Sequence, residues 1–165
     1  MLKKWLLMML CATLLTGCAS ATFETLGDIP HQQVDAPMPR KVILDLPEDT
    51  VQAVWSQEDD TMYLCQDYTV HLQVLSAGDL QSTIRQVSGF EKENLTILES
   101  RCGDHDRFEW VWIATGEGGD AVYRCAVLSD ANFHYALTLS ANAETAGNLT
   151  EQWNNIMRSF CLENV

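Results

Sequence analysis

The chain has 165 residues, of which 47% are hydrophobic, and its 10 basic and 23 acidic side chains give a formal net charge of -13. This size and composition fit one ordinary domain with a short extension, and they exclude a disordered or low-complexity protein. The acidic balance also argues against nucleic acid as a partner, because a negative surface repels phosphate backbones.

The first 17 residues have the features of a bacterial signal peptide. A short basic start precedes the apolar run 5–15, which is shorter than the roughly 20 residues that a membrane-spanning helix needs. The run ends in Leu15-Thr16-Gly17-Cys18, which resembles a lipobox, where the chain is cleaved before a cysteine that carries diacylglycerol. We therefore predict a lipoprotein signal peptide at 1–17 and a lipid attachment site at Cys18. The alternatives are a plain secretory signal and a short signal anchor.

The predicted mature chain begins with a tether at residues 18–40, which holds three of the four prolines and shows no helical or alternating period. Cleavage would leave 8 basic and 23 acidic side chains, a formal charge of -15. Two fatty acyl chains, such as palmitate, hold a protein firmly, since each buried methylene adds about 0.8 kcal/mol. We expect a cell-membrane protein, lipid-anchored on the extracytoplasmic face, whose acidic domain stands off the headgroups. The choice between inner and outer membrane stays open for a cell with two.

A single globular domain is predicted for residues 41–165, and it begins with strands and one helix. Apolar, β-branched and aromatic runs predict four strands, the last two forming a hairpin, at 42–46, 51–55, 61–65 and 69–75. Leu80, Ile84 and Val87 then fall on one helical face. Asp79 is a suitable N-terminal cap and Gly89 a natural stop, which predicts a short amphipathic helix between them.

The next part of the chain predicts an antiparallel meander, because short polar turns separate four strand-like runs. These runs are 95–101, 107–115, 121–128 and 133–140. In the second run Phe108, Trp110 and Trp112 alternate with Val111 and Ile113, so apolar side chains point to both sides of the sheet. We expect helices to cover both faces at least in part.

A helix closes the domain, starting near Thr145. Its amphipathic stripe has apolar side chains at helical spacing, namely Leu149, Trp153, Ile156, Met157 and Phe160. We expect Trp153 and Phe160 to anchor this helix on the sheet. The predicted fold class is α+β, an antiparallel β-sheet meander with a short helix and a C-terminal amphipathic helix packed on it.

A lipoprotein signal, a tether, this order of elements and the closing helix 153–160 together resemble the PsbP-like family. That α/β/α fold occurs in an extrinsic photosystem subunit, in small bacterial lipoproteins and in a nuclear import factor. The chain also resembles uncharacterised lipoproteins of gut-type Firmicutes, through residues 78–80, 116–120 and 134–135. The resemblance covers about residues 41–163. It implies a shared scaffold and no catalytic residue, because family members do not share one activity.

Four cysteines follow the predicted anchor: Cys65, Cys102, Cys125 and Cys161. An extracytoplasmic compartment permits disulfides, and four cysteines allow three full pairings. The absence of a CxxC spacing argues against a thioredoxin-type site or a zinc knuckle. The pairing stays open, as does the alternative of buried thiols.

Signatures of known catalytic sites are missing from the sequence. Asp104-His105-Asp106 is the best metal candidate, but three adjacent side chains do not converge on one ion without help, so we expect a solvated turn. Residues 116–119 predict a hairpin turn rather than a phosphate-binding loop. We expect His134 to be structural, and His31 and His71 have no obvious partner.

The function predicted from the sequence is a non-enzymatic, membrane-anchored binding or scaffolding module. It would use no cofactor and no metal, and it would have a protein partner in the cell envelope. One alternative is a carrier or sensor of a small ligand held between the sheet and the helices, which an enclosed pocket among Trp110, Trp112 and Trp153 would favour. The other alternative is a metal-dependent enzyme that uses His105.

Overall fold

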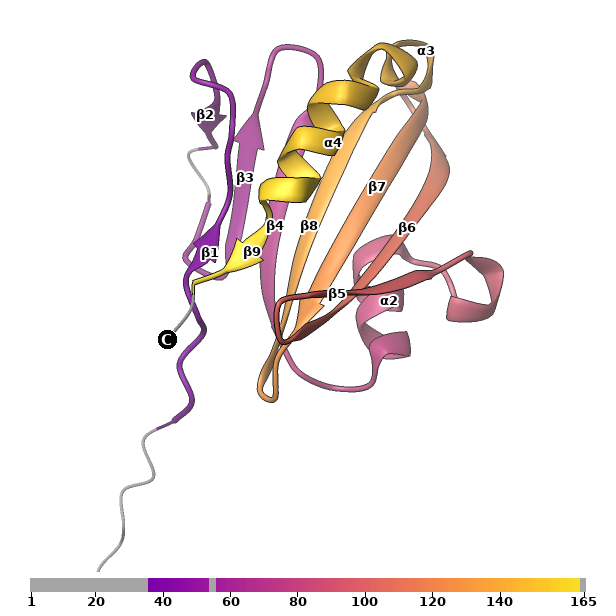
Figure 1. Ribbon diagram of the computed structural model, residues 1–165. Helices are drawn as coiled ribbons and strands as arrows, with labels where there is room; N and C mark the ends of the chain where they lie inside the picture. Colours follow the sequence, from indigo (N-terminus) through magenta and orange to yellow (C-terminus); the bar gives the residue numbers. More distant parts are fainter. Residues whose placement is uncertain (1–35, 54–55, 164–165) are drawn as a thin grey trace, which may run out of the picture. The chain divides into compact units, whose positions relative to one another are not determined.

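The computed structural model describes residues 36–53 and 56–163, and Pro37–Val165 form one compact unit (Figure 1). The predicted signal peptide, Cys18 and His31 lie outside the described residues. Within the described residues, no helix is long and apolar enough to cross a membrane.

The unit is built on a seven-stranded antiparallel sheet with the strand order β2-β3-β4-β8-β7-β6-β5. The last four strands along the chain are neighbours in the sheet, which confirms the predicted meander, and β4 joins the early hairpin to it through β8. The strands of this sheet are β2 (Val51–Gln52), β3 (Asp60–Leu64), β4 (Thr69–Ser76), β5 (Leu98–Cys102), β6 (His105–Gly116), β7 (Gly119–Ser129) and β8 (Phe133–Asn142).

Helices cover both faces of this sheet, so the predicted α+β class is correct. In Figure 1, α4 (Thr150–Ser159) lies in front of the sheet and α2 (Leu80–Ser88) lies behind it. We call the two sides the α4 face and the α2 face. Because side chains alternate along a strand, β6 sends Arg107 and Glu109 to the α4 face and Trp110 to the α2 face.

The α4 face holds the larger core. Trp153, Ile156, Met157 and Phe160 of the closing helix and its end are buried against Leu137 and other apolar side chains of β8, β7 and β4. Each such side chain contributes about 1.5–3 kcal/mol when it is withdrawn from water. The predicted anchors Trp153 and Phe160 are therefore confirmed as core residues.

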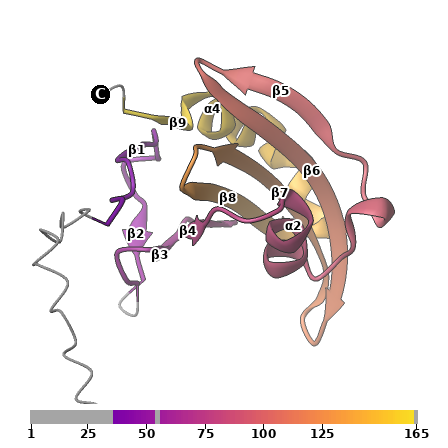
Figure 2. The ribbon, with the colours of Figure 1, turned by 90° about the horizontal axis from the view of Figure 1, so that it is seen from below.

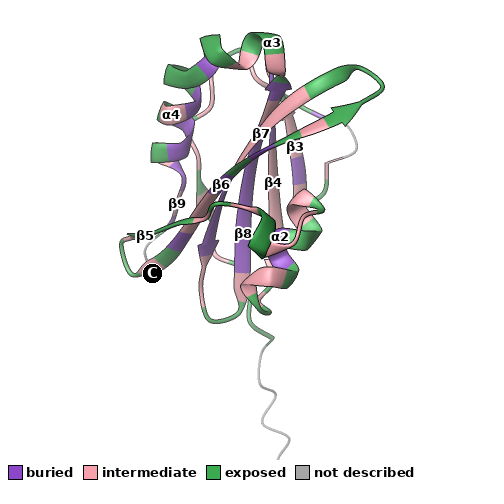
Figure 3. Ribbon diagram, turned by 90° about the vertical axis from the view of Figure 1, so that its right-hand side faces the viewer, coloured by how far each residue is buried: buried purple, intermediate pink, exposed green. Residues whose placement is uncertain are grey.

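The α2 face holds a second core around Ile84, which packs with Trp110, Trp112 and Cys125. The ring of Trp112 stacks on Tyr123 at 5.0 Å. Figure 2 shows β6 bending around the side on which α2 lies. The bend lets one short helix and the segment after it cover the tryptophans, which accounts for burial on both faces of the inner strands (Figure 3).

The predicted helix ends are confirmed at α2. Asp79 accepts a hydrogen bond from the backbone N–H of Ser82 at 2.8 Å, and Gly89 has a φ of 76°, a left-handed conformation that glycine adopts at low cost. The closing helix is less regular than predicted. It begins as α3 (Ala143–Ala146), tightens into the 3-10 turn η2 (Gly147–Leu149) and continues as α4.

Three predicted strands and one predicted turn are shorter in the structure, and the bounds of the other predicted strands shift by two residues at most. The first strand is only β1 (Val42–Ile43), because the N–H of Asp45 donates to Ser159 Oγ instead of to a strand. The predicted strand 51–55 is limited to β2 within the described residues, and the one at 95–101 begins at Leu98, after the 3-10 turn η1 (Lys92–Asn94). The predicted turn 103–106 contains only two residues, since Cys102 already pairs with His105.

The last strand, β9 (Cys161–Leu162), was not predicted from the sequence. It pairs antiparallel with β1, with Val42 opposite Leu162 and Ile43 opposite Cys161. Residues just before and just after the seven-stranded sheet are thereby brought together.

Candidate functional site

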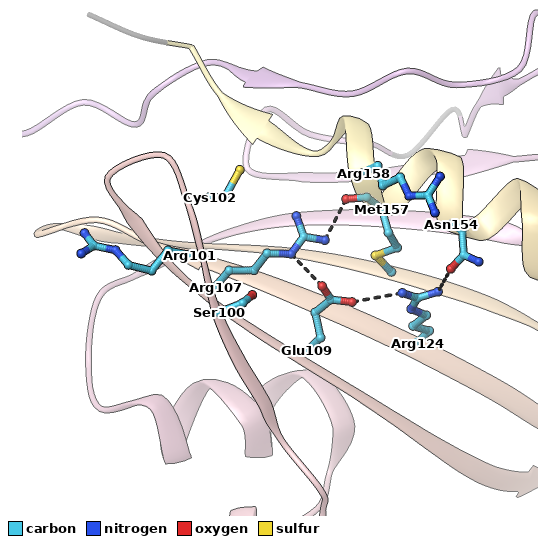
Figure 4. A pocket seen from close by; sticks show the side chains of 9 residues that line it. All are labelled: Ser100, Arg101, Cys102, Arg107, Glu109, Arg124, Asn154, Met157 and Arg158. Carbon is cyan, nitrogen blue, oxygen red and sulfur yellow. Dashed lines mark hydrogen bonds and ion pairs between the residues drawn. The ribbon is translucent and has the colours of Figure 1, made fainter.

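A cavity of about 430 Å³ lies between α4 and the strands β5, β6 and β7 (Figure 4). We call it the arginine cleft, because four of its nine lining residues are arginines. The lining residues are Ser100, Arg101, Cys102, Arg107, Glu109, Arg124, Asn154, Met157 and Arg158.

Glu109 joins the two inner arginines of the cleft. Its Oε1 accepts a 2.8 Å hydrogen bond from Arg107 Nε, and its Oε2 accepts one of 3.1 Å from Arg124 Nη2. Arg107 lies two residues from Glu109 on β6, and Arg124 is its diagonal neighbour on β7, so all three side chains leave the α4 face of the sheet together. One carboxylate thus holds two cations in fixed positions.

Arg107 also holds the end of α4. Its side chain is buried, and its Nη2 and Nη1 donate to the carbonyl oxygens of Met157 and Phe160 at 2.7 and 3.2 Å. Carbonyl groups in the last turn of a helix have no partner within the helix and carry its partial negative charge. The guanidinium therefore caps α4 and fixes it to β6.

Arg124 makes the second link between sheet and helix. Its Nη1 donates to Asn154 Oδ1 at 2.6 Å, while its Nη2 is held by Glu109. Arg107 and Arg124 thus hold the walls of the cleft together through hydrogen bonds to Glu109 and to α4.

The outer arginines are exposed at the rim. Arg101 Nη2 donates to the carbonyl oxygen of Asp104 at 3.0 Å, and its Nε lies 3.8 Å from Asp106 Oδ1. Arg158, in the last turn of α4, has no side-chain hydrogen bond or ion pair with any other described residue. Its side chain is exposed, and Figure 4 draws it extending from α4 among the other lining side chains.

The charge of the cleft is opposite to that of the protein. Half of the basic side chains within the described residues line it, together with one acidic side chain, Glu109, while the whole chain carries a formal charge of -13. Low-dielectric walls strengthen the field of clustered charges. The cleft is therefore a positive site on an acidic domain.

Three exposed apolar side chains continue the same face of the sheet beyond the edge of α4. Leu98, Val111 and Ile113 are 63%, 54% and 59% exposed, and we call them the apolar strip. A second hollow of about 380 Å³, lined partly by Leu98, Val111 and Arg124, joins the strip to the cleft. Coverage of the α4 face is therefore partial, as expected, and these three residues lie in the part that no helix buries.

The three residues of the predicted metal candidate do not converge in the structure, because Asp104 lies in the turn and His105 and Asp106 point to opposite faces of β6. His105 and Asp106 belong to β6, where His105 Nε2 lies 3.4 Å from Arg40 Nη1, and a guanidinium would repel a bound cation. Among residues 36–53 and 56–163, no three histidine, cysteine or carboxylate side chains are grouped to hold an ion. The expected solvated turn is shorter than predicted, because only Asp104 of the three residues lies in it.

The three tryptophans do not share a pocket. Trp110 and Trp112 lie in the core of the α2 face, whereas Trp153 lies in the core of the α4 face. The sheet separates them, so the enclosed pocket that would favour the carrier hypothesis is not formed by these residues.

The histidines of the described strands have structural partners. His134 is buried, as expected, and a 2.6 Å hydrogen bond joins its Nδ1 to Thr83 Oγ1 of α2. Burial lowers its pKa below the ordinary value, because the charged form loses hydration. His71 was not expected to have a partner, yet its Nε2 lies 2.5 Å from Asp60 Oδ1 on the paired strand β3.

The four described cysteines are not bridged in the structure, and their surroundings differ. Cys125 is fully buried in the α2-face core, and burial raises its pKa to about 12. Cys65 lies beside Thr50, with 3.6 Å between Sγ and Oγ1. Cys102 and Cys161 line one cavity of about 590 Å³ together with Arg40 and His105.

No protein-family model and no curated protein sequence matches the chain. Solved structures do match. One is PA94 from Pseudomonas aeruginosa, a protein of unknown function described as a putative regulator. It aligns with a TM-score of 0.51 and 12% sequence identity, and the alignment covers 79% of this chain and 89% of PA94. The fold is shared. The Saccharomyces cerevisiae Ran-binding protein Mog1p has a TM-score of 0.50 and 11% identity over 76% of this chain and 96% of its own.

A third similar structure is LpqN of Mycobacterium tuberculosis, which is involved in cell envelope biogenesis. Its TM-score is 0.49, with 12% identity over 79% of this chain and 87% of its own. At identities this low the matches establish the architecture alone. The fold expected from the PsbP-like resemblance is confirmed, and the activity of this chain must be inferred from its own residues.

Proposed function

We propose that the protein is a non-enzymatic, lipid-anchored binding module of the bacterial cell envelope. In this proposal, the arginine cleft and the apolar strip form one surface that binds a protein partner whose carboxylates lie beside apolar side chains. The observation that carries the proposal is the concentration of arginines at one cavity of an otherwise acidic domain.

The location is supported by the sequence. The basic start, the short apolar run and Leu15-Thr16-Gly17-Cys18 together predict cleavage and lipidation at Cys18. A two-chain anchor keeps the domain at the membrane surface, where its partners would be other envelope proteins.

The choice of an acidic partner follows from the available donors. Glu109, Met157 and Phe160 already occupy Arg107, but Arg158 is free to pair with a carboxylate from another molecule. Arginine binds carboxylates through two parallel hydrogen bonds, which gives direction as well as charge attraction. The fixed inner arginines add a positive field behind the rim.

The apolar strip supports a protein rather than a free anion. Protein interfaces combine an apolar centre with a polar rim, and arginine is enriched in them. Leu98, Val111 and Ile113 supply such a centre beside Arg124.

A binding role also fits the chemistry of the cleft walls. Both carboxylate oxygens of Glu109, the acidic side chain of the cleft, accept hydrogen bonds from guanidinium groups that hold the cleft walls. The nine lining residues of the arginine cleft include no histidine that could act as a base beside Ser100, and His105, which is paired with Cys102, lies 3.4 Å from a guanidinium nitrogen of Arg40.

Site-specific photo-crosslinking in living cells tests the proposal. A photoreactive residue would replace Val111 in the strip, Asn155 on the outer side of α4, or Glu93, exposed in η1 on the other side of the domain. We expect one protein adduct at position 111 that is lost when Arg158→Glu is added, and no such adduct at position 93. Equal capture at all three positions, or capture that ignores Arg158→Glu, would exclude a partner at this surface.

A further inference from the structure

We infer that Cys102 and Cys161 form a disulfide in the mature protein, and that this bond ties the β5–β6 turn to β9 beside the arginine cleft. The inference rests on the extracytoplasmic location in the proposed function, because thiols in the cytoplasm are kept reduced. It names one pair where the sequence left three full pairings open.

The fold excludes every pairing that uses Cys125. This side chain is fully buried on the α2 face, between Trp110 of β6 and Thr138 of β8 in the strand register. Cys65 and Cys102 pack against the core of the opposite face. Since each full pairing of four cysteines includes Cys125, at most one bridge forms among the described residues.

Cys65 lies at the wrong end of the sheet to join that bridge. It follows Leu64, which aligns with Thr69 and Ser140 at one end of the strands. Cys102 precedes the turn to His105, and the neighbouring Asp106 aligns with Ser129 and His134 at the other end. β3 and β5 are also five strand spacings apart, on the order of 24 Å.

Cys102 and Cys161 lie on either side of one hydrogen-bonded contact. Arg107 donates to the carbonyl oxygen of Phe160 at 3.2 Å, and Cys161 is the next residue along the chain. Cys102 pairs with His105, two positions before Arg107, so its side chain leaves the same face of the sheet. In Figure 4 the Cys102 sulfur points away from β5 on the side where β9 leaves α4.

Space and access also favour this pair. Both cysteines are half-buried and line the same cavity of about 590 Å³. Cys102 lies next to Gly103, which has a φ of 61° in the exposed two-residue turn. An oxidant can therefore reach this pair, whereas Cys125 is inaccessible.

The oxidation is a thiol–disulfide exchange with a disulfide-bonded oxidoreductase of the envelope or an oxidised low-molecular-weight disulfide. One thiolate attacks the disulfide donor and forms a mixed disulfide, and the second thiolate displaces the donor's remaining sulfur. The protein loses two electrons and two protons in total, and the donor is reduced to two thiols.

Peptide mapping of the full-length protein from membranes tests the pair directly. Free thiols are blocked with an alkylating agent during lysis, without reductant, and trypsin then places the four cysteines on separate fragments. The fragments are 42–85 with Cys65, 102–107 with Cys102, 125–158 with Cys125 and 159–165 with Cys161. We expect fragments 102–107 and 159–165 to be joined, and the other two to be alkylated.

The same protein is also equilibrated with oxidised and reduced glutathione, which separates the two proposals. One outcome is a protein without lipid on Cys18 whose cysteines are reduced in cells but whose Cys102 and Cys161 become linked in this buffer. That outcome overturns the proposed extracytoplasmic location and supports the Cys102–Cys161 bond. A lipidated protein in which both cysteines stay alkylated in cells and after equilibration overturns the pair and leaves the location intact. A disulfide that involves Cys65 would also overturn the Cys102–Cys161 pair.

Thermal unfolding supplies an independent measurement. We expect Cys102→Ser and Cys161→Ser each to lower the melting temperature by on the order of 10 °C, as reduction of the unmodified protein does. Reductant should have no further effect on these two variants. In the control Cys65→Ser, reductant should lower the melting temperature as much as it does in the unmodified protein. If reductant lowered the melting temperature of Cys102→Ser by that same amount, the Cys102–Cys161 bond would be excluded.

Discussion

Arg107 Nη2 donates a 2.7 Å hydrogen bond to the carbonyl oxygen of Met157, in the last turn of α4. This contact joins residues 50 positions apart and brings a cation to the negative end of the helix. The helix, the sheet and the positive cleft therefore depend on one side chain.

Replacing Arg107 should destabilise the domain. Arg107→Met removes three charge-assisted hydrogen bonds and leaves two helix carbonyls without their buried donor, so we expect the free energy of unfolding to fall by about 3 kcal/mol. Urea denaturation measures this loss. Arg101→Met, at the exposed rim, is the matched control and should stay within about 0.5 kcal/mol of the unmodified protein. Equal stability of both variants would mean that Arg107 does not fix α4.

The apolar strip should serve binding rather than folding. Val111→Ser removes an exposed methyl pair, so we expect the midpoint of urea denaturation to change little, while capture of the envelope partner falls at least tenfold. Val127→Ser, in a fully buried position of the paired strand, should unfold the domain at a clearly lower urea concentration. Unchanged capture in Val111→Ser would remove the strip from the proposed interface.

His134 should make stability depend on pH. Burial lowers its pKa in the folded protein, so the unfolded chain binds a proton more readily. The stabilisation by neutral His134 is complete above the ordinary histidine pKa of about 6.5, and it is lost as the pH falls through that value toward the lower folded pKa. Urea midpoints at pH 7.5 and 5.5 should therefore differ less in His134→Gln than in the unmodified protein. A larger difference in the variant would contradict this sign.

Cys125 should resist modification in the folded state. Its thiol is buried and its pKa is raised to about 12, so the reactive thiolate is scarce at neutral pH. We expect iodoacetamide to label the half-buried Cys65 within minutes, and to label Cys125 only at the rate of unfolding. Mass spectrometry of fragments 42–85 and 125–158 over time measures both rates. Equal labelling of the two would contradict the observed packing.

Substitution of Cys18 tests the predicted lipid anchor. Cys18→Ala should leave an unprocessed precursor without lipid, because the acceptor sulfur is absent, while intact-mass measurement of the native protein should show a diacylated amino terminus at Cys18. The neighbouring Ser20→Ala is the control and should be processed normally. Lipid labelling of the Cys18→Ala protein would exclude this attachment site.

The meander could be predicted from the sequence because alternation is a local property. Phe108, Trp110 and Trp112 mark one face of β6 without any knowledge of its neighbours, and Asp79 and Gly89 mark the ends of α2 in the same way. β9 could not be predicted, because two residues form a strand only when β1 lies beside them. β9 therefore exists only in the folded protein, where the two ends of the domain are paired.

The arginine cleft was missed for a related reason. Arg101, Arg107, Arg124 and Arg158 are spread over 58 positions of the sequence, and each resembles an ordinary surface charge. One signal was present: Arg107 and Glu109 point to the α4 face from a strand whose other face is aromatic. Polar residues at those alternate positions indicated either a solvent-exposed face or a buried hydrogen-bond network. Only the packing of α4 on the sheet decides between the two.

The pairing of β1 with β9 has a mechanical consequence. The chain enters the domain at Arg40 and Lys41, and Lys41 accepts a 2.9 Å backbone hydrogen bond from Glu163 near the other end of the described chain. A pull applied through the segment before Arg40 would therefore first load β1 against β9 and the contact between Arg40 and Tyr135. The seven-stranded sheet would bear force only after β1 had separated from β9.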